Sequence, residues 1–403
     1  MLGIDWFWTV ILMAVAASGA VRYLPILPER WRVPASVAVM LAFICWMPFT
    51  IGTFDTSLLT KAAAWTIVAI GLNILTGYNG QISLGHGAFV LIGAYTAAIL
   101  TDSKEHLSFI DQAAWPFWAA TIMGGLVAAA AGLAVGIPAL RLSGPYLAVA
   151  TLGLVLALPS VLTKYDGFTG GRLGIRRVPK PPVPGFLEDW AQAFGGDLSR
   201  DQWFFFLALF AAVAMTALAF YIVRSRWGRA FVAVRDSEVA AAAVGMNVAR
   251  TKVTAFTISA FYAGIAGAIF LFTFQGSISP ETIGIILSIT FFTAIVIGGL
   301  GSIMGAIIGG FVVVFLPDLA TDAATSIFGE QQGKQLWPTV YGIVLIGVII
   351  LMPHGVAGFL HRLARLRPAQ VADAARGLPA ALRSRLGQTL ERLSWGGKDT
   401  GRP

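Results

Sequence analysis

Charged residues are scarce in this sequence. Asp, Glu, Lys and Arg together make up 12% of its 403 residues, against roughly 25% in a typical soluble domain. Hydrophobic residues make up 57%, and the mean hydropathy is +0.77. A soluble protein of this length would need a far larger polar surface. The composition therefore predicts an integral membrane protein, with the lipid bilayer as its surroundings and no nucleic-acid partner.

Cysteine and the common catalytic motifs are also nearly absent. Cys45 is the only cysteine, so no disulfide can form within the chain. The sequence contains no GxxxxGK[ST] phosphate loop, no HExxH or CxxC metal pattern and no GxSxG elbow. Gly333-Lys334 is followed by Gln335, and Gly397-Lys398 by Asp399. We therefore expect no enzyme activity, no bound cofactor and no metal site.

Long apolar runs dominate what is present. Segments of roughly 17 to 25 apolar residues can span a bilayer as helices, and eleven occur, beginning near Trp6, Pro34, Leu58, Gln81, Phe117, Gly144, Gln202, Thr254, Thr282, Ser302 and Pro338. The first run could be a signal peptide, but Met1 to Asp5 contains no Lys or Arg, which favours a retained span. We expect an all-α polytopic membrane protein of about 10 to 11 transmembrane helices, divided into N-terminal spans (1–57), a core (58–353) and a tail (354–403).

The basic residues predict the orientation, because cytoplasmic loops retain Lys and Arg. Loop 224–253 carries six and the tail nine, which places both in the cytoplasm and the N-terminus outside. Loop 164–201 also carries six but is balanced by acidic residues, and we expect it on the outer side. The tail places Leu382, Leu386, Leu390 and Leu393 on one helical face. It is expected either to lie on lipid or a partner as a helix, or to be solvated.

Several spans lack ionisable groups altogether. The spans between Thr254 and Phe315 and the span from Pro338 to Met352 contain no Asp, Glu, Lys or Arg, Glu281 lying in a loop between spans, so proton or ion coupling has few groups to use. His86 is the one ionisable side chain well inside a span, and Lys61 is expected at a span end. A lone histidine among glycines is more often a neutral hydrogen-bonding group than a proton relay.

Glycine and polar residues interrupt one apolar segment, Asn79 to Leu100. Lipid cannot satisfy exposed backbone, so such residues are tolerated where protein or a water-filled route replaces lipid. We expect the substrate route here, although the same residues could simply pack. The candidate path residues are Asn79, Gln81, Ser83, Gly85, His86 and Gly87.

Small residues recur every four positions in three spans. At this spacing they form a ridge that lets helix backbones approach closely. Packing within one subunit is the simpler interpretation, and a subunit interface is the alternative. The ridges are Gly124-Ala128-Gly132-Gly136, Ala260-Gly264-Ala268 and Gly301-Gly305-Gly309.

The loop segment Arg235 to Lys252 predicts a short capped helix. Asp236 or Ser237 can cap it, Glu238 suits its positive end, and Gly245 is a natural stop. Taken alone, such a helix is usually a connector, but its small apolar face could rest in a groove of a soluble partner. The candidate coupling residues are Arg235, Asp236, Ser237, Glu238, Ala241, Gly245 and Arg250.

Five segments in matching order carry a family resemblance. They are LTGYNGQISLGHGAFVLIGAYTAA, LRLSGPYLAVATLGL, RDSEVAAAAVGMNVARTKVTAFTISAFYAGIAGAIF, SISPETIG and VIGGLGSIMGAIIGG. Together they resemble the permease subunit of branched-chain amino-acid ABC importers of the LivM type. The resemblance covers about 58 to 352 and implies the permease fold of these importers, in the bacterial inner membrane.

The resemblance also implies partners and a mechanism. The helix from Glu238 to Gly245 would be the coupling helix, seated on one of two ATPase subunits. A second, related permease and a periplasmic substrate-binding protein would complete the complex. The expected function is alternating-access import of branched-chain or related small amino acids, driven by ATP hydrolysis in the partners. The alternative is a passive channel for a small polar solute such as an amide or urea, which would have no use for a coupling helix.

Overall fold

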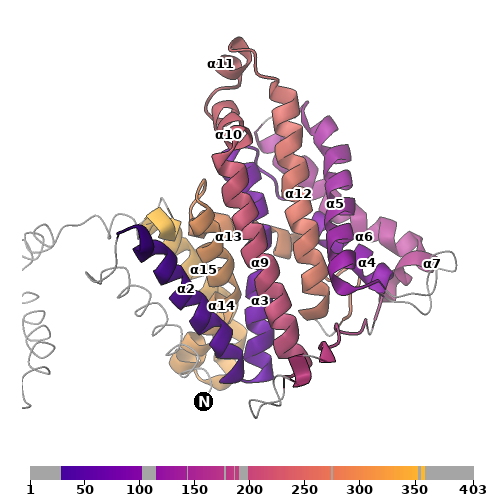
Figure 1. The fold of residues 1–403 in the computed structure, drawn as a ribbon, viewed down its shortest axis with the longest axis vertical. Coiled ribbons are helices and arrows are strands. Elements are labelled where there is room, and N and C mark those ends of the chain that lie inside the picture. Colours follow the sequence, from indigo (N-terminus) through magenta and orange to yellow (C-terminus); the bar gives the residue numbers. More distant parts are fainter. Residues whose placement is uncertain are drawn as a thin grey trace, which may run out of the picture.

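The computed structural model shows a helical bundle whose long axis runs from a protruding helical tip to the opposite, loop-rich end (Figure 1). The structure describes residues 29–101, 115–142, 144–176, 178–185, 187–189, 198–273, 276–352 and 355–358. Within these residues it contains no β-strand, and Ile175 and Ile278 form an isolated antiparallel bridge. The predicted all-α fold class is confirmed.

Helices account for most of the described chain. In order they are α2 (Glu29–Trp46), η1 (Met47–Phe49), α3 (Thr53–Asn73), η2 (Ile74–Tyr78), α4 (His86–Thr101), α5 (Phe117–Ala139), α6 (Pro145–Lys164), α7 (Asp166–Thr169), η3 (Gly171–Leu173), α9 (Arg200–Arg224), α10 (Arg226–Asp236), α11 (Glu238–Ala243), α12 (Val248–Thr273), α13 (Ile285–Gly298), α14 (Ile303–Phe328) and α15 (Glu330–Leu351).

Six of these helical segments are long and apolar enough to cross a membrane: Thr53–Tyr78, Phe117–Ala139, Pro145–Lys164, Arg200–Arg224, Val248–Thr273 and Ile303–Ser326. Four shorter apolar helices, Ala35–Phe49, His86–Thr101, Ile285–Gly298 and Pro338–Gly347, lie in the other predicted spans. The apolar run at Trp6 lies outside the described residues. Of the predicted tail, 354–403, the structure describes residues 355–358.

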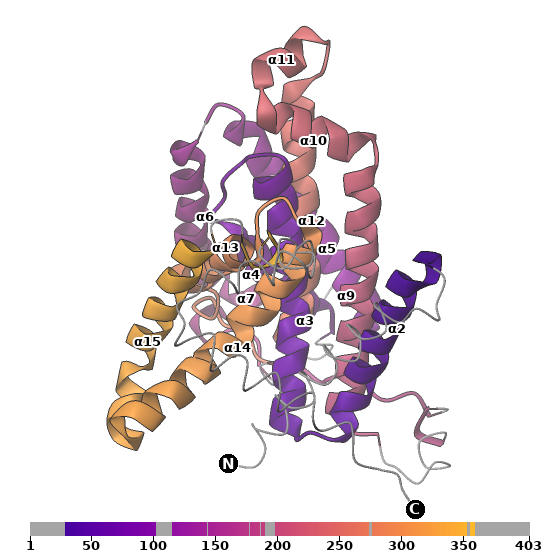
Figure 2. The ribbon, with the colours of Figure 1, turned by 90° about the vertical axis from the view of Figure 1, so that its left-hand side faces the viewer.

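Helices α3 and α12 form the centre of the bundle, with α9 on one side and α4 and α5 on the other (Figures 1 and 2). Their most apolar stretches are each 83% buried, compared with 22% for α6 and α9. Tyr262 of α12 is fully buried, and its hydroxyl donates to the Met215 carbonyl of α9 at 2.9 Å. The two central helices are therefore enclosed by protein rather than lipid.

Glycine allows the closest helix contacts in this core. A Cβ on Gly264 of α12 would lie 2.5 Å from both the Ala128 side chain and the Gly124 carbonyl of α5. A Cβ on Gly93 of α4 would collide with the backbone of Gly264. The ridges on α5 and α12 thus pack against each other within the subunit, as the simpler interpretation predicted.

The third predicted ridge is only partly a helix ridge. Gly305 and Gly309 lie on α14 and face α13, where a Cβ on Gly305 would lie 2.6 Å from the Gly298 carbonyl. Gly301, in contrast, lies in the turn before α14 with φ +74°. Its N–H donates to the side-chain oxygen of Asn73 at 2.9 Å. Gly301 therefore serves the turn rather than helix packing.

Three charged residues lie deeper in the spans than their sequence positions indicated. Lys61, expected at a span end, is more than two turns into α3, which starts at Thr53. Helix α14 does not end near Phe315 but continues through Pro317 to Phe328, so it includes Asp318 and Asp322. The expectation that span interiors are nearly free of charge is wrong at this end of the molecule.

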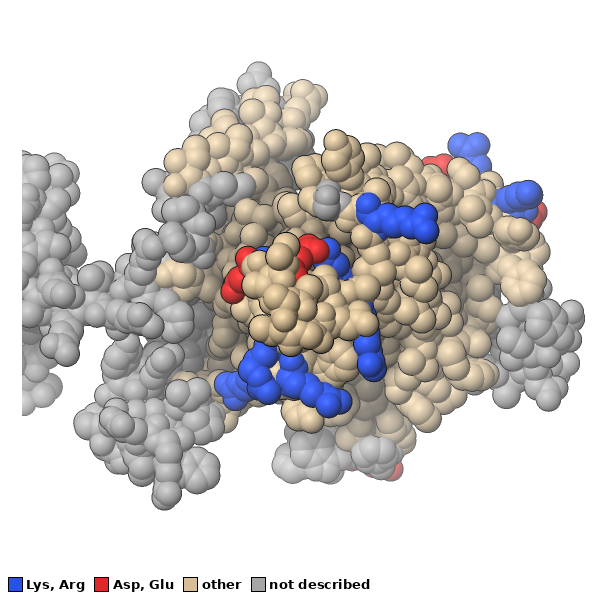
Figure 3. All heavy atoms as spheres, turned by 90° about the horizontal axis from the view of Figure 1, so that it is seen from above, with Lys and Arg blue, Asp and Glu red and all other residues tan. Residues whose placement is uncertain are grey.

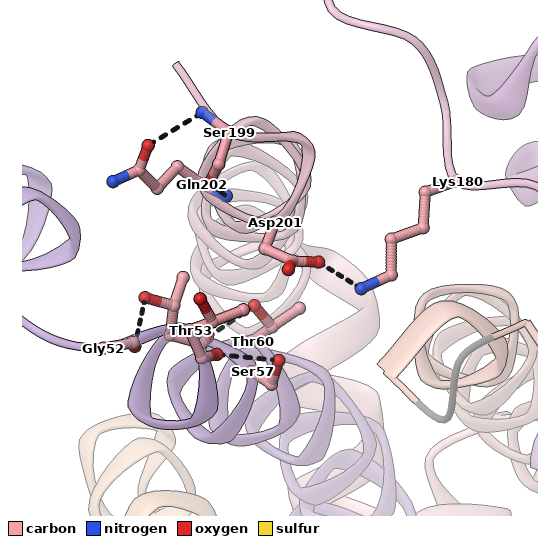
Figure 4. A network of polar contacts seen from close by, with 9 residues as sticks. Gly52, Thr53, Ser57, Thr60, Lys180, Ser199, Asp201 and Gln202 are labelled. Atoms are coloured by element: carbon pink, nitrogen blue, oxygen red, sulfur yellow. Dashed lines mark hydrogen bonds and ion pairs between the residues drawn. The ribbon is translucent and has the colours of Figure 1, made fainter. Parts of the chain in front are cut away.

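The end opposite the tip is joined by polar contacts (Figure 4). Ser199 caps α9 through a reciprocal capping box with Gln202, whose side-chain amide also donates to the Pro48 carbonyl at 2.9 Å. Lys180, from the predicted outer loop, pairs with Asp201 at the start of α9. These contacts hold the described part of loop 164–201 against the helix ends.

Candidate translocation and coupling site

The predicted path segment breaks the chain between α3 and α4. Helix α3 widens into the π-helical turn η2, and residues 79–85 are not helical. Gly80 has φ +77°, and the Gln81 N–H reaches back to the Leu75 carbonyl at 3.1 Å. The helix expected from Gln81 thus starts at His86. Its 16 residues extend about 24 Å, less than the ~30 Å hydrocarbon layer.

His86 lies at the start of α4 in a buried hydrogen-bonded chain. Its Nδ1 lies 3.1 Å from Ser83 Oγ, and its Nε2 lies 2.6 Å from Ser259 Oγ of α12. Ser259 Oγ in turn donates to the Gly71 carbonyl of α3 at 2.6 Å. The Ser259 hydroxyl hydrogen is already donated to Gly71, so its oxygen accepts a hydrogen bond from His86 Nε2–H. The other ring nitrogen, Nδ1, then accepts from the Ser83 hydroxyl. A neutral imidazole satisfies the chain, and His86 joins α3, α4 and α12.

The two path glycines are sites of close backbone contact. A Cβ on Gly85 would lie 2.5 Å from the Thr151 carbonyl of α6, and the adjacent Leu84 N–H donates to Thr151 Oγ1 at 3.1 Å. A Cβ on Gly87 would collide with Ser288 Oγ of α13, to which the Gly87 N–H donates at 3.1 Å. The start of α4 is therefore held directly against α6 and α13.

Asn79 differs from its neighbours in lacking partners. Its side chain is 2% exposed, and neither its amide nitrogen nor its oxygen has a hydrogen-bond partner within the described residues. Leaving a buried amide unpaired costs roughly 1 to 3 kcal/mol per group. Such a cost is tolerated where water or a polar solute visits the site.

Loop 224–253 is tied to the break by two direct hydrogen bonds. Arg235 of α10 donates from Nη1 to the Gly77 carbonyl in η2 at 2.9 Å. Gln81 donates from Nε2 to the Lys252 carbonyl in α12 at 3.1 Å. Lys252 also pairs with Glu238 of α11 at 2.7 Å. The predicted path and coupling residues, far apart in sequence, thus share one network.

Helix α11 forms the tip of the molecule, with the charged residues of the loop gathered around it. Ser237 caps it, its hydroxyl accepting from Ala240 N–H at 3.2 Å, and Gly245 follows it with φ +84°. Ala241 is buried, whereas Val239 and Val244 are 82% and 78% exposed. Seen from above, acidic and basic side chains surround an uncharged knob (Figure 3).

Not every predicted coupling residue faces outward. The Arg235 guanidinium donates hydrogen bonds within the subunit, to the Gly77 carbonyl and, at 2.9 Å, to the Asp236 carboxylate. Glu238 is likewise engaged by Lys252. Arg250 is exposed, and its guanidinium lies 5.8 Å from the Trp227 ring centroid. The exposed surface of the tip therefore combines the two valines and small residues with the acidic side chains of Asp236 and Glu238, which are 62% and 54% exposed.

Sequence reasoning missed several members of this network. Asn73 links α3 to the turn before α14, donating to the Ser302 carbonyl at 2.7 Å and accepting from Gly301. Ser259 was not among the predicted site residues, yet it is the partner of His86 across 173 positions. An asparagine inside an apolar span was the one available signal, because membrane asparagines seek partners.

These features define the class: a polytopic all-α membrane protein with a broken helix at its core. The profile of the family described as "Branched-chain amino acid transport system / permease component" matches residues 56–352. The chain therefore belongs to this family, which is one of transport permeases rather than enzymes.

Individual relatives agree. The chain is 34% identical to the high-affinity branched-chain amino acid transport system permease protein LivM of Escherichia coli K12 over 333 residues, 79% of this chain and 73% of the relative. The Salmonella typhimurium LivM is 32% identical over the same length and shares. The permease LivH of Salmonella typhimurium is 29% identical over 304 residues, 74% of this chain and 92% of the relative. No solved structure matches significantly.

Proposed function

We propose that this chain is a transmembrane subunit of an ATP-binding-cassette importer in the bacterial inner membrane, with α11 as the helix that couples it to an ATPase. The observation that carries the proposal is the tip itself. A capped helix presents two valines to solvent, and its neighbours reach the break in the core through Arg235 and Gln81. Solvent-exposed valines on a protruding helix fit a groove on a soluble partner.

The proposed path follows the break between α3 and α4. Asn79, Gln81, Ser83, Gly85, His86 and Gly87 lie together there, and the unpaired Asn79 amide supports their contact with a polar solute. Movement of α11 would pull on Gly77 and Gln81, because both are hydrogen-bonded to the loop that carries it. Alternating access would then be a change in the position of this break.

The named relatives suggest the substrate and partners. Two kinds of relative, LivM and LivH, are both permeases of branched-chain amino acid transport systems. We therefore propose branched-chain or related small amino acids as the substrate and a homologous permease as the partner in the membrane. Two ATPases and a periplasmic binding protein would complete the complex, with the C-terminus of this chain in the cytoplasm.

A passive channel is the alternative, and reconstitution separates the two. The full complex is placed in proteoliposomes, with leucine and its binding protein on one side and ATP on the other. We expect uptake against a leucine gradient that needs hydrolysable ATP. Equilibration at the same rate without ATP would establish the channel.

The tip should be sensitive to a buried charge. Val239→Asp introduces an unpaired carboxylate at the proposed contact, and we expect ATPase association to weaken at least tenfold, or about 1.4 kcal/mol. Val239→Thr, which keeps the volume without the charge, is the matched control and should bind within about threefold of the wild type. Copurification and titration of the ATPase measure both. Equal affinity of the aspartate variant would remove α11 from the interface.

Thiol labelling tests the orientation. In a Cys45→Ala background, Glu281→Cys should react with a membrane-impermeant reagent from outside, and Val239→Cys should react after the membrane is opened. Both side chains are well exposed, and neither caps a helix, unlike Ser199 and Ser237. The reverse pattern would place α11 outside, where no ATPase could reach it.

A further inference from the structure

A cavity of about 550 Å³ opens between helices α3, α12, α13, α14 and α15, away from the broken helix. Its polar lining includes Ser57 and Lys61 of α3, Thr290 of α13 and Asp318 of α14. Trp65 and Val314 supply apolar walls. This volume falls in the range of pockets that hold small organic molecules.

The two charged groups lie inside membrane-spanning helices. Lys61 is about 12 Å along α3 from Thr53, and Asp318 lies within the span Ile303–Ser326. A charge in a span costs several kcal/mol unless it faces protein or water, so such residues indicate a functional site. Asp318 is exposed to the cavity side of the bundle, and Lys61 is partly exposed.

Lys61 and Asp318 lie close enough to act on each other electrostatically, but they are not in direct contact. No ion pair within 4.0 Å involves Lys61 or Asp318 in the described part of the chain. Lys61 Nζ lies 5.1 Å from the centre of the Trp65 ring, a contact that stabilises a cation without neutralising it. The cavity thus offers one cationic and one anionic group side by side with an aromatic surface.

A third polar group lies next to Asp318. Pro317 has no N–H, so the carbonyl of Val313, which lines the cavity, cannot receive the usual helical hydrogen bond from that position. Lys61 is the charge that acts most strongly on Asp318, and Asp322 and Asp55 add negative charge near it. This wall of the cavity therefore favours an ammonium group, and the Lys61 wall favours a carboxylate.

We propose that this cavity binds the zwitterionic backbone of an apolar amino acid, with the ammonium group at Asp318, the carboxylate at Lys61 and the side chain against Trp65. The inference rests on the proposed import function and adds a second contact point for the substrate. The cavity adjoins the end of α3 opposite the tip, near Ser57 (Figure 4). It would therefore receive the amino acid before the broken helix does.

Thiol protection tests the site without the ATPases. In the full-length Cys45→Ala chain, Ser57→Cys places a thiol on the cavity wall, and its rate of labelling by a membrane-impermeant reagent is measured. We expect leucine to slow labelling. We expect 4-methylpentanoate, which lacks the amino group, and 3-methylbutylamine, which lacks the carboxylate, to have no effect at the same concentration.

Charge variants then assign the two walls. Lys61→Met and Asp318→Asn should each abolish protection by leucine, whereas Lys61→Arg and Asp318→Glu should retain it. Glu281→Gln, an exposed acidic residue before α13 and outside the cavity lining, is the matched control, and leucine should protect it as it protects the parent. Folding is checked for each variant by monodispersity in detergent.

Three results would overturn the site. They are labelling that leucine does not slow, protection by 3-methylbutylamine without a carboxylate, and protection by leucine that survives in both Lys61→Met and Asp318→Asn. The first two remove the zwitterion from the cavity, and the third removes the named charges. None of them touches ATP-driven uptake by the unmodified complex, which is measured separately. Uptake without protection would leave the proposed function standing and the cavity site refuted.

Discussion

Gly85→Leu is expected to abolish transport. The first side-chain carbon would already lie 2.5 Å from the Thr151 carbonyl, so the start of α4 must move away from α6. Overpacking of this kind costs roughly 1 to 3 kcal/mol, and the displaced residues include His86, whose hydrogen bonds join α3, α4 and α12. We expect uptake to fall more than tenfold, which corresponds to about 1.4 kcal/mol.

Gly153→Leu is the matched control, because nothing lies within 4 Å of a Cβ at that position of α6. It should transport at close to the wild-type rate, with both variants compared at equal amounts of inserted protein. If Gly85→Leu transports as well as Gly153→Leu, the contact between α4 and α6 has no part in the transport cycle. If it inserts normally but its melting temperature alone falls, the glycine serves stability only.

The sequence predicted the local features of this protein well. Apolar runs located the helices, and the Ser237 and Gly245 signals located α11 almost to the residue. Ridges of small residues indicated close packing, and the structure shows their partners within the chain. These features depend on neighbours in sequence, where periodicity and capping chemistry carry the information.

Features that depend on distant residues could not be predicted in this way. Nothing near His86 indicates Ser259, and nothing near Arg235 indicates the Gly77 carbonyl 158 positions away. The length of α14 was also missed. Proline followed by aspartate usually marks a helix end in sequence, but here Pro317 is accommodated within the helix, and the cavity with Asp318 went unseen.

The hydrogen bonds of the loop indicate how a signal could pass from the tip to the core. The side chains of Arg235 and Gln81 each form a hydrogen bond that links two elements, and we call these bonds struts. The Arg235 strut joins α10 to η2, and the Gln81 strut joins the break to α12. Gly80 fits tightly beneath the first, since a Cβ there would lie 2.9 Å from Arg235 Cγ. A strut that bears on a π-helical turn acts where the helix is already weakened, because such turns are rare and often functional.

Arg235→Met is accordingly expected to uncouple ATP hydrolysis from transport. The variant keeps the aliphatic stem but loses the hydrogen bonds to Gly77 and Asp236. A charge-assisted hydrogen bond contributes about 1.5 to 3 kcal/mol. Its loss should therefore change the equilibrium between the two positions of the break tenfold or more. Hydrolysis by the reconstituted complex should persist, because α11 itself is intact, while leucine imported per ATP hydrolysed should fall about tenfold.

Arg229→Met provides the comparison on the same helix. Arg229 is exposed, and within the described residues its side chain donates only to the nearby Arg224 carbonyl, at 3.3 Å, so its loss removes a charge from α10 without altering the break. Its ratio of import to hydrolysis should match the wild type. Arg235→Lys should lie between, since one ammonium group can reach Gly77 but cannot also bridge to Asp236 as the guanidinium does. An unchanged ratio in Arg235→Met would show that the strut is structural, and coupling would then have to pass through Gln81 and Lys252.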